Sequence, residues 1–278
     1  KQALFHWLVS PATPCVMGPM DPQDARFWGM PTPPGAEFSD ASLVERVRTA
    51  MQRDFPVEVI ARDPWTVHKL LAERYSSGDV FLAGDACHLH SPFGGHGMNL
   101  GISDAVDLGW KLAAVLEGWG GRALLDSYET ERKPVHRLVL DTSTENVAAL
   151  SDHFLAPDLD ADTPEGAGRR AEAAVAVEKI KAPEFRSLGA VIGYRYASPC
   201  IAVETESEPP AFSVTEYVAS AWPGSLAPHE WLANGASLYD RLGREFTLLR
   251  LGEADGPGEA AFVDAAAGCG LPLSVVEA

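Results

Sequence analysis

The sequence is poor in cysteine, in positive charge and in long apolar runs, and each shortage excludes a class of protein. Its four cysteines form no C-x-x-C pair and no metal-like cluster, so we interpret them as reduced thiols of a cytoplasmic protein. No apolar run approaches the roughly 20 residues that span a membrane, and no signal-peptide pattern opens the chain. Lys and Arg number 22 against 39 Asp and Glu, a net charge of −17, so nucleic acid is not an expected partner.

The remaining composition is that of an ordinary globular protein. The 278 residues suit one large domain or two modest ones, with 46% hydrophobic and 22% charged residues. The chain starts within a strand-like run without an initiator Met and stops on another such run. This pattern suggests a fragment of a longer protein.

Residues 1–75 are expected to form part of a strand-rich, substrate-binding sheet domain with one helix. Ser39, Asp40 and Ser42 offer caps for a helix near 42–54. Strands are predicted at 2–9, in "CVMGPM" and "RFWGMP", at 57–61 ("VEVIA") and within 65–72 ("WTVHKLLA").

Residues 76–197 are expected to alternate one buried strand with helices. The strand covers 79–84, and an amphipathic helix follows Gly97 and ends at the glycines from Gly118 onward. A second helix runs from about Ala123 to about Leu150, with a kink or break predicted at Pro134. A third helix is expected near 169–180.

The last segment, 198–278, is predicted to be a separate domain. It contains a strand, a helix and a strand in succession, which is a βαβ pattern. The fold class expected for the whole chain is therefore mixed α/β.

The most informative stretch runs from Val80 to Ala113. A strand ending at Gly84 would deliver Asp85 to the carboxyl edge of a sheet, where ligands of α/β proteins usually bind. An ionised carboxylate there suits the hydroxyls of a polyol. The loop 92–97 is poor in side chains, so its backbone can touch a flat ligand. The free N–H groups of the following helix favour negative charge. Together these features fit a planar ring system that becomes anionic when it is reduced.

This stretch resembles the second flavin-binding motif of the class A flavoprotein monooxygenases, which share the para-hydroxybenzoate hydroxylase fold. The matching residues are "GDACH" at 84–88, "SPFGGHGMN" at 91–99, "DA" at 104–105 and "LGWKL" at 108–112. "LLDSYETERKPV" at 124–135 is similar to the family's next helix. Residues 223–249 are similar to the thioredoxin-like C-terminal domain of the phenol and hydroxyphenylpropionate hydroxylase branch.

The resemblance implies an FAD-dependent oxidoreductase that hydroxylates a small phenolic or other aromatic substrate. NADPH or NADH would reduce FAD, and O2 would then form a flavin C4a-hydroperoxide. Asp85 would bind the ribityl hydroxyls, and backbone N–H groups would face the N1 and O2 edge of the isoalloxazine. The residues that would line the flavin are Pro92, Gly94, Gly95, His96, Gly97, Met98 and Asn99. Trp7, Trp28, Pro92 and Phe93 are candidates for contact with the substrate, and no residue is singled out as catalytic or as a metal ligand.

The sequence departs from the family pattern at several points. The family's N-terminal G-x-G-x-x-G turn, which holds the ADP half of FAD, is absent from these residues, and the thioredoxin-like segment is incomplete. Cys87 and Ser91 replace an alanine and a proline. His96 stands where relatives often have Gln or Lys, and a protonated imidazole there would stabilise the reduced flavin anion.

Several residues of the motif have simpler interpretations. His88 is expected to be structural, and Asn99 is a candidate helix cap. Trp110 and Lys111 fall in mid-helix, where core packing and solvent exposure are the ordinary outcomes. Tyr128 and Arg132 lie four residues apart on one helix, so a pair between them is expected.

Two other functions remain open at the level of sequence. The chain could be a non-catalytic remnant or scaffold that keeps the fold without turnover. It could also be a flavin enzyme with a different outcome, such as Baeyer–Villiger oxygenation or antibiotic inactivation. Relatives commonly form homodimers, so a homodimer is the expected assembly if the chain associates.

Overall fold

The structure is a computed structural model that describes residues 5–10, 13–154, 158–203, 208–252 and 257–277. The chain divides into two compact units that each combine separate stretches of sequence. Unit 1 holds 1–67 and 144–184, and unit 2 holds 68–143 and 185–278. The three consecutive ranges expected from the sequence divide the chain differently and stay predictions. No helix among the described residues is long and apolar enough to cross a bilayer.

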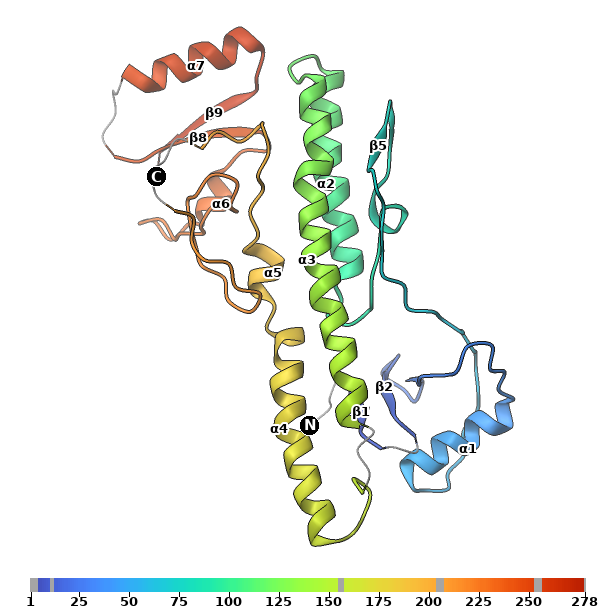
Figure 1. Cartoon of the computed structure of the whole chain (residues 1–278). Helices are drawn as coiled ribbons and strands as arrows, with labels where there is room; N and C mark the ends of the chain where they lie inside the picture. Colours follow the sequence, from blue (N-terminus) through green and yellow to red (C-terminus); the bar gives the residue numbers. More distant parts are fainter. Residues whose placement is uncertain (1–4, 11–12, 155–157, 204–207, 253–256, 278) are drawn as a thin grey trace. The chain divides into compact units, whose positions relative to one another are not determined.

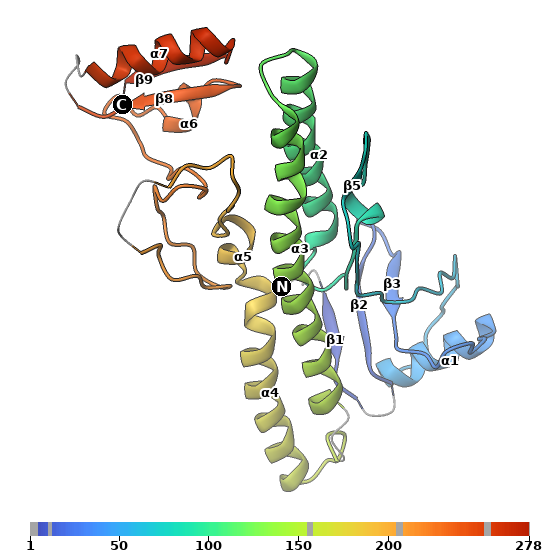
Figure 2. The same cartoon turned by 45° about the horizontal axis from the view of Figure 1, so that its top comes forward.

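Unit 1 contains an antiparallel sheet of three strands, one complete helix and all but the last residue of a second helix (Figure 2). Trp7 pairs with Val16, and Met17 pairs with Trp28, so the strands follow one another as a meander. Ser39 starts the first helix, because its side chain accepts a hydrogen bond from the Ser42 N–H. The elements are β1 His6–Leu8, β2 Cys15–Pro19, β3 Arg26–Gly29, α1 Asp40–Met51 and α4 Pro164–Phe185, the last residue of which falls in unit 2.

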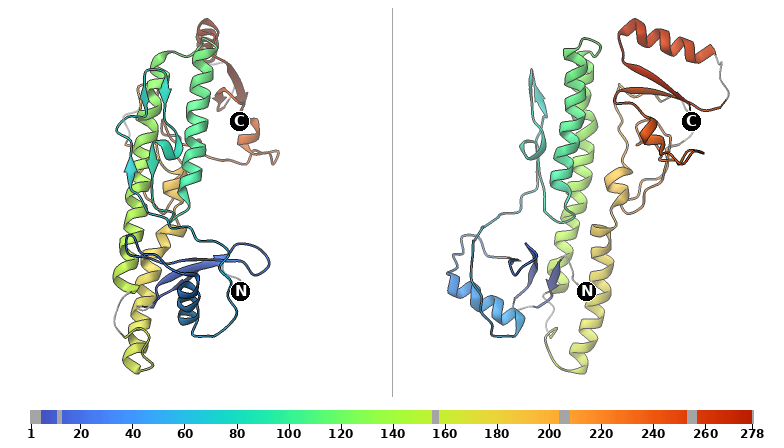
Figure 3. Two further views of the ribbon diagram at one scale, coloured as in Figure 1. Left: turned by 90° about the vertical axis from the view of Figure 1, so that its right-hand side faces the viewer. Right: turned by 180° about the vertical axis from the view of Figure 1, so that it is seen from behind.

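Unit 2 is built on a hairpin of two long helices that run side by side in opposite directions (Figures 1 and 3). These are α2 His96–Leu116 and the first two-thirds of α3 Arg122–Phe154. The turn between them closes at Gly118, whose φ of +87° lies in the left-handed region, and the Gly120 N–H donates to the Ala114 carbonyl. The predicted end of this helix at the glycines is thus confirmed.

Short strands lie beside the hairpin and pair only locally. They are β4 Leu70–Leu71, β5 Ser76–Ser77, β6 Val80–Phe81 and β7 His88–Leu89, in the antiparallel pairs β4–β7 and β5–β6. The core under them is formed by Tyr75, Cys87 and Tyr128, and the Tyr128 hydroxyl donates to the Leu82 carbonyl at 2.9 Å.

The end of unit 2 is a parallel strand pair joined by a helix. β8 Phe246–Arg250 and β9 Leu273–Glu277 pair in parallel, and α7 Pro257–Cys269 connects them. This confirms the predicted βαβ pattern. Its assignment to a thioredoxin-like domain stays a prediction. Two short helices precede it, α5 Leu188–Ile192 and α6 Leu238–Arg241.

Three local predictions are wrong. Residues 57–61 and most of 65–72 are not strands, since only Leu70–Leu71 finds a strand partner. Pro56 and Pro64 interrupt this stretch and supply no N–H for a ladder. The strand expected over 79–84 is only two residues long, because Val80–Phe81 pairs through a tight turn with Ser76–Ser77. At Pro134 the helix α3 continues without a break, and the kink considered there stays a prediction.

Candidate flavin-binding site

Asp85 lies in a short turn rather than at the end of a strand. This is the single turn of 3₁₀ helix η1 Gly84–Ala86, which follows β6 after Leu82 and Ala83. Gly84 adopts a φ of +58°, which favours glycine, and so turns the chain sharply just before the carboxylate. Asp85 is exposed, and its side chain forms no hydrogen bond within the described part of the chain. The carboxylate is therefore available to a ligand.

The loop that follows has a backbone path that only glycine adopts easily. Gly94 and Gly95 have φ values of +95° and +66°, and the Gly95 N–H donates to the Pro92 carbonyl at 3.0 Å. A Cβ on Gly94 would lie 2.6 Å from the His96 ring. The imidazole thus occupies the space that a side chain at 94 would need, whereas a Cβ on Gly95 would meet no atom within 4 Å.

The start of α2 leaves its first N–H groups without a side-chain cap. Gly95 is the N-cap residue in a left-handed conformation and offers no capping oxygen. Asn99, by contrast, donates through Nδ2 to the Gly95 carbonyl at 3.1 Å, so it holds the loop against the helix. Uncapped N–H groups at the positive end of a 21-residue helix suit a ligand edge that carries negative charge.

The Asp85 turn packs on the same end of α2 as the glycine loop. A Cβ on Gly101 would lie only 3.5 Å from the Gly84 Cα, so the two backbones pass at close range. The Gly84 N–H donates to Asp104 Oδ2 at 3.0 Å, which ties the turn to the next turn of the helix. An exposed carboxylate and a helix start without a side-chain cap are thereby held at one helix end.

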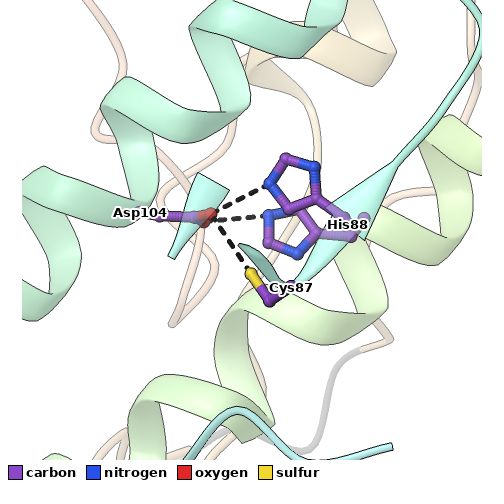
Figure 4. Close-up of side chains that lie close together, drawn as sticks. Cys87, His88 and Asp104 are labelled. Atoms are coloured by element: carbon purple, nitrogen blue, oxygen red, sulfur yellow. Dashed lines mark hydrogen bonds and ion pairs between the residues drawn. The ribbon is translucent and has the colours of Figure 1, made fainter. Parts of the chain in front are cut away.

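Beneath this surface lies a fully buried carboxylate, that of Asp104 (Figure 4). Its Oδ1 accepts hydrogen bonds from Arg132 Nε at 2.8 Å and from His136 Nε2 at 2.9 Å. Its Oδ2 accepts from His88 Nε2 at 3.0 Å as well as from the Gly84 N–H. Four N–H donors from three segments thus saturate one carboxylate.

The protonation states of this cluster follow from burial and contact. Burial alone would raise the pKa of Asp104, but hydrogen bonds from His136, His88 and Arg132 outweigh it and hold that pKa below its usual range. Burial lowers the pKa of His136 to about 4, against the opposing pull of Asp104. His136 is therefore neutral at pH 7, with Nδ1 accepting from the Tyr75 hydroxyl at 2.7 Å. Arg132 supplies the charge that balances Asp104.

Four buried side chains of this cluster have the chemistry of metal ligands. One ligand atom each from Cys87, His88, Asp104 and His136 lies within 4.8 Å of the others. Burial raises the pKa of the Cys87 thiol to about 12, which disfavours the thiolate that binds metals. The guanidinium of Arg132 already holds the carboxylate that a cation would need. The cluster is thus best described as a hydrogen-bonded network in which the charges of Asp104 and Arg132 cancel.

A second buried network lies farther along the hairpin. Lys111 Nζ contacts Asp107 Oδ2 at 2.8 Å and Glu131 Oε2 at 2.5 Å, and the Lys111 side chain has no exposed surface. The Ser198 hydroxyl donates to the other oxygen of Glu131. Lys111 is thus not exposed to solvent, and two carboxylates compensate for the burial of its charge.

Sequence reasoning placed some of these residues correctly and missed others. His88 is structural, as expected, but Tyr128 and Arg132 do not pair with each other: Tyr128 contacts Leu82 and Arg132 contacts Asp104. The sequence did contain a signal for the buried ion pairs. Asp104, Asp107 and Lys111 follow one another at intervals of three and four residues in an otherwise apolar helix, so they lie on one face, and charges on a buried face need partners.

The candidate substrate residues fall in different units. Trp7 and Trp28 belong to the sheet of unit 1, where Lys181 Nζ lies 4.3 Å from the centre of the Trp7 ring. Pro92, which is exposed, and Phe93, which is half-buried, belong to the glycine loop of unit 2. The role of these four residues in substrate binding stays a prediction.

Residues 3–143 match the family described as "FAD binding domain". The FAD-dependent monooxygenase apdD of Emericella nidulans is 39% identical over 80% of this chain and 38% of its own length. The 4-methyl-5-nitrocatechol 5-monooxygenase of a Burkholderia species is 36% identical over 88% of this chain and 43% of its own. Among solved structures, the rebeccamycin biosynthetic enzyme RebC with reduced flavin matches at a TM-score of 0.85 and 37% identity.

Each of these matches covers a larger share of this chain than of the similar protein. The RebC comparison covers 99% of this chain and 51% of RebC. This chain therefore spans about half of that solved structure and less than half of the two curated relatives.

Proposed function

The chain belongs to the FAD binding domain family, and on that premise we propose that it forms the flavin-binding part of an FAD-dependent aromatic monooxygenase. The observation that carries the proposal is the exposed carboxylate of Asp85 beside the uncapped start of α2. A polyol chain needs a hydrogen-bond acceptor, and a reduced flavin needs donors at its pyrimidine edge. The two features stand at one end of one helix, as a ligand with both groups requires.

The proposed roles follow from this arrangement. Asp85 accepts hydrogen bonds from ribityl hydroxyls. The N–H groups of Gly97 and Met98, in the first turn of α2, face the N1 and O2 edge, where the helix dipole favours negative charge. Pro92 and the backbone of 94–99 contact the face of the ring, which lies close because Gly94 and Gly95 present no side chain.

The reaction proposed is hydroxylation of an aromatic ring. When bound, FAD supplies the redox chemistry that joins NADPH or NADH to O2: one oxygen atom enters the substrate, the other leaves as water, and the nicotinamide is oxidised. The residues of this chain bind and orient the cofactor and keep water from it. The aromatic class of substrate is supported by the similarity to the nitrocatechol monooxygenase and by the aromatic side chains Trp7, Trp28 and Phe93.

His96 is proposed to tune the flavin. Its ring is half-buried beside Gly94, at the start of the helix that would face the pyrimidine. A protonated imidazole there would stabilise the anionic reduced flavin. The variant His96→Gln should lower the reduction potential of bound flavin and remove part of its dependence on pH. Unchanged values of both would contradict this role.

The function is tested by titrating the full chain with FAD and following the flavin absorbance and fluorescence. The exposed Asp79, six residues before Asp85, provides a matched control. We expect Asp85→Ala to weaken FAD binding by roughly ten- to a hundredfold, since charge-assisted hydrogen bonds are lost, and Asp79→Ala to leave it unchanged. Equal affinities for both variants and the parent chain, or no binding by the parent, would contradict the proposal.

A further inference from the structure

Tyr75 donates a hydrogen bond to a buried base. Its hydroxyl lies 2.7 Å from His136 Nδ1, and the two rings stack with their centroids 5.5 Å apart. Neither residue has any exposed surface. His136 in turn donates through Nε2 to Asp104 Oδ1 at 2.9 Å. A phenol, an imidazole and a carboxylate therefore form one continuous hydrogen-bonded row that is shielded from bulk water.

Tyr128 provides an internal comparison, because it is equally buried but donates to a different kind of acceptor. Its ring lies 6.0 Å from the ring of Tyr75, and its hydroxyl donates to the Leu82 carbonyl at 2.9 Å. Burial is the largest cause that raises the pKa of both hydroxyls above the ordinary range, so both are protonated at pH 7. The two phenols thus differ in their acceptor: an imidazole can take up a proton, whereas a backbone carbonyl cannot.

The acceptor determines how easily a phenol loses an electron. Removal of one electron turns a phenol into a radical cation, and a positive charge on a buried ring is costly. If the acceptor takes the proton at the same time, a neutral phenoxyl radical is left instead. Burial lowers the pKa of His136 to about 4, but a phenol radical cation is a far stronger acid than an imidazolium. The imidazole of His136 is therefore a sufficient base.

The groups around the pair favour this proton transfer. Because Asp104 accepts from Nε2, the lone pair of the neutral His136 ring lies on Nδ1 and faces Tyr75. After transfer, the imidazolium would lie between the carboxylate and the phenoxyl oxygen. Lys133 Nζ lies 5.6 Å from the centre of the Tyr75 ring, but it pairs at 3.2 Å with Glu129, which also accepts from the Tyr75 N–H. The charges of Lys133 and Glu129 therefore largely cancel at Tyr75.

We propose that Tyr75, His136 and Asp104 form a one-electron donor site, in which Tyr75 is oxidised to a neutral radical while its proton moves to His136. The electron goes to a strong one-electron oxidant such as a hydroxyl radical, which is reduced to hydroxide. The O–H bond of Tyr75 breaks, and an N–H bond forms at Nδ1 of His136. This activity goes beyond the proposed function, since the site needs neither FAD nor an aromatic substrate.

The position of the site suggests a protective role, and this role alone rests on the proposed function. Asp104 also accepts from the Gly84 N–H at 3.0 Å, so the hydrogen-bonded row ends directly beneath the turn that carries Asp85. O2 that is reduced at a flavin without oxidising a substrate leaves as peroxide, and hydroxyl radicals form from peroxide and iron(II). A phenol that is easily oxidised beneath the cofactor site would collect such oxidising equivalents in one place.

The experiment uses the full chain without FAD. A laser flash on a ruthenium polypyridyl complex with a sacrificial electron acceptor produces ruthenium(III), a one-electron oxidant. EPR spectroscopy of frozen samples then measures the yield of tyrosyl radical that persists. We expect such a radical in the parent chain, a yield lower by about tenfold or more in Tyr75→Phe and in His136→Gln, and the parent's yield in Tyr128→Phe. Circular dichroism of each variant establishes that it is folded.

The parent chain alone supplies a second measurement, which does not depend on the folding of any variant. High-field EPR reports whether the phenoxyl oxygen accepts a hydrogen bond, as it should from His136 Nδ1–H. The proposal is overturned by a parent chain without a persistent tyrosyl radical, or by a radical without that hydrogen bond. Equal yields in Tyr75→Phe and Tyr128→Phe, or the parent's yield in His136→Gln, would also overturn it. Since FAD is absent throughout, failure of the proposed function would leave this test unaffected.

Discussion

Asp104 and Arg132, 28 residues apart in the sequence, form an ion pair at 2.8 Å in which neither side chain has any exposed surface. The pair joins α2 to α3 directly beneath the turn that carries Asp85. It therefore links the folding of the helical hairpin to the geometry of the proposed flavin site.

Removing the charge of Asp104 should destabilise the protein severely. Asp104→Asn leaves Arg132 buried without a counter-ion, and loss of one partner of a buried pair costs about 3–5 kcal/mol. Urea unfolding measures the change. Asp126→Asn serves as the control, since it removes a pair with Arg122 in which the carboxylate is 60% exposed, and should cost less than about 1 kcal/mol. Similar losses for both variants would refute the buried role of Asp104.

Removing the charge of Lys111 should destabilise the protein to a comparable degree, because here it is the carboxylates that lose their cation. Lys111→Met leaves Asp107 and Glu131 as buried carboxylates without a cation, at a cost of about 3–5 kcal/mol. Thermal or urea unfolding reports it. The matched variant Lys69→Met breaks a pair in which the Asp141 side chain is 60% exposed. We expect it to leave the free energy of unfolding almost unchanged. If Lys111→Met is as stable as the parent chain, the charges around it are solvated rather than buried.

Stability should fall as the pH falls from about 6.5 towards 4. Burial lowers the pKa of His136 from 6.5 to about 4, so the unfolded chain binds more protons than the folded chain within that window. The free energy of unfolding then decreases with decreasing pH, by on the order of 3 kcal/mol. The depressed pKa of Asp104 adds a further loss only below the ordinary range of Asp.

Urea unfolding across this pH window, on the parent chain and two variants, tests the assignment to His136. His136→Gln should flatten the slope between pH 6.5 and 4, while His229→Gln, at an exposed position, should keep it. Burial also lowers the pKa of His90, which leaves a smaller slope in that variant. A slope that His136→Gln does not diminish would place the titrating group elsewhere.

A methyl group at Gly94 should disturb the loop more than one at Gly118. Both glycines have strongly positive φ values, +95° and +87°, so both alanine variants carry the backbone strain of about 1 kcal/mol or more. Only at Gly94 would the new Cβ meet another group, the His96 ring at 2.6 Å. FAD titration should therefore show weaker binding by Gly94→Ala and unchanged binding by Gly118→Ala. Urea unfolding should show a larger loss of stability for Gly94→Ala than for Gly118→Ala. Equal affinities would mean that His96 moves aside freely.

Local features were predictable from the sequence because local chemistry determines them. Ser39 caps the helix that follows it through a contact within four residues, which does not depend on distant parts of the chain. The glycines at 94 and 95 likewise predicted a loop of bare backbone. The strand–helix–strand order at the end of the chain predicted a parallel pair, since parallel strands need such a crossover.

Features that depend on distant partners were not predictable in the same way. The stretch 57–72 has strand-like composition, yet a strand exists only where another segment offers hydrogen bonds, and only Leu70–Leu71 finds one. The donors of Asp104 come from positions 16 to 32 residues away, so no local pattern announces them. The motif match placed Asp104 and Arg132 in the family pattern, but their contact became visible only in the structure.

The saturation of Asp104 also has a consequence for local motion. Its donors come from the turn at Gly84, the strand at His88 and the helix α3, and no lone pair is left over for water. If one of these segments opened alone, Asp104 would lose a donor while the other two segments still kept it from bulk water. Because that state is costly, we expect the three segments to open together. In native-state hydrogen exchange the protected amides of these segments would then share one opening free energy, as a single cooperative unit.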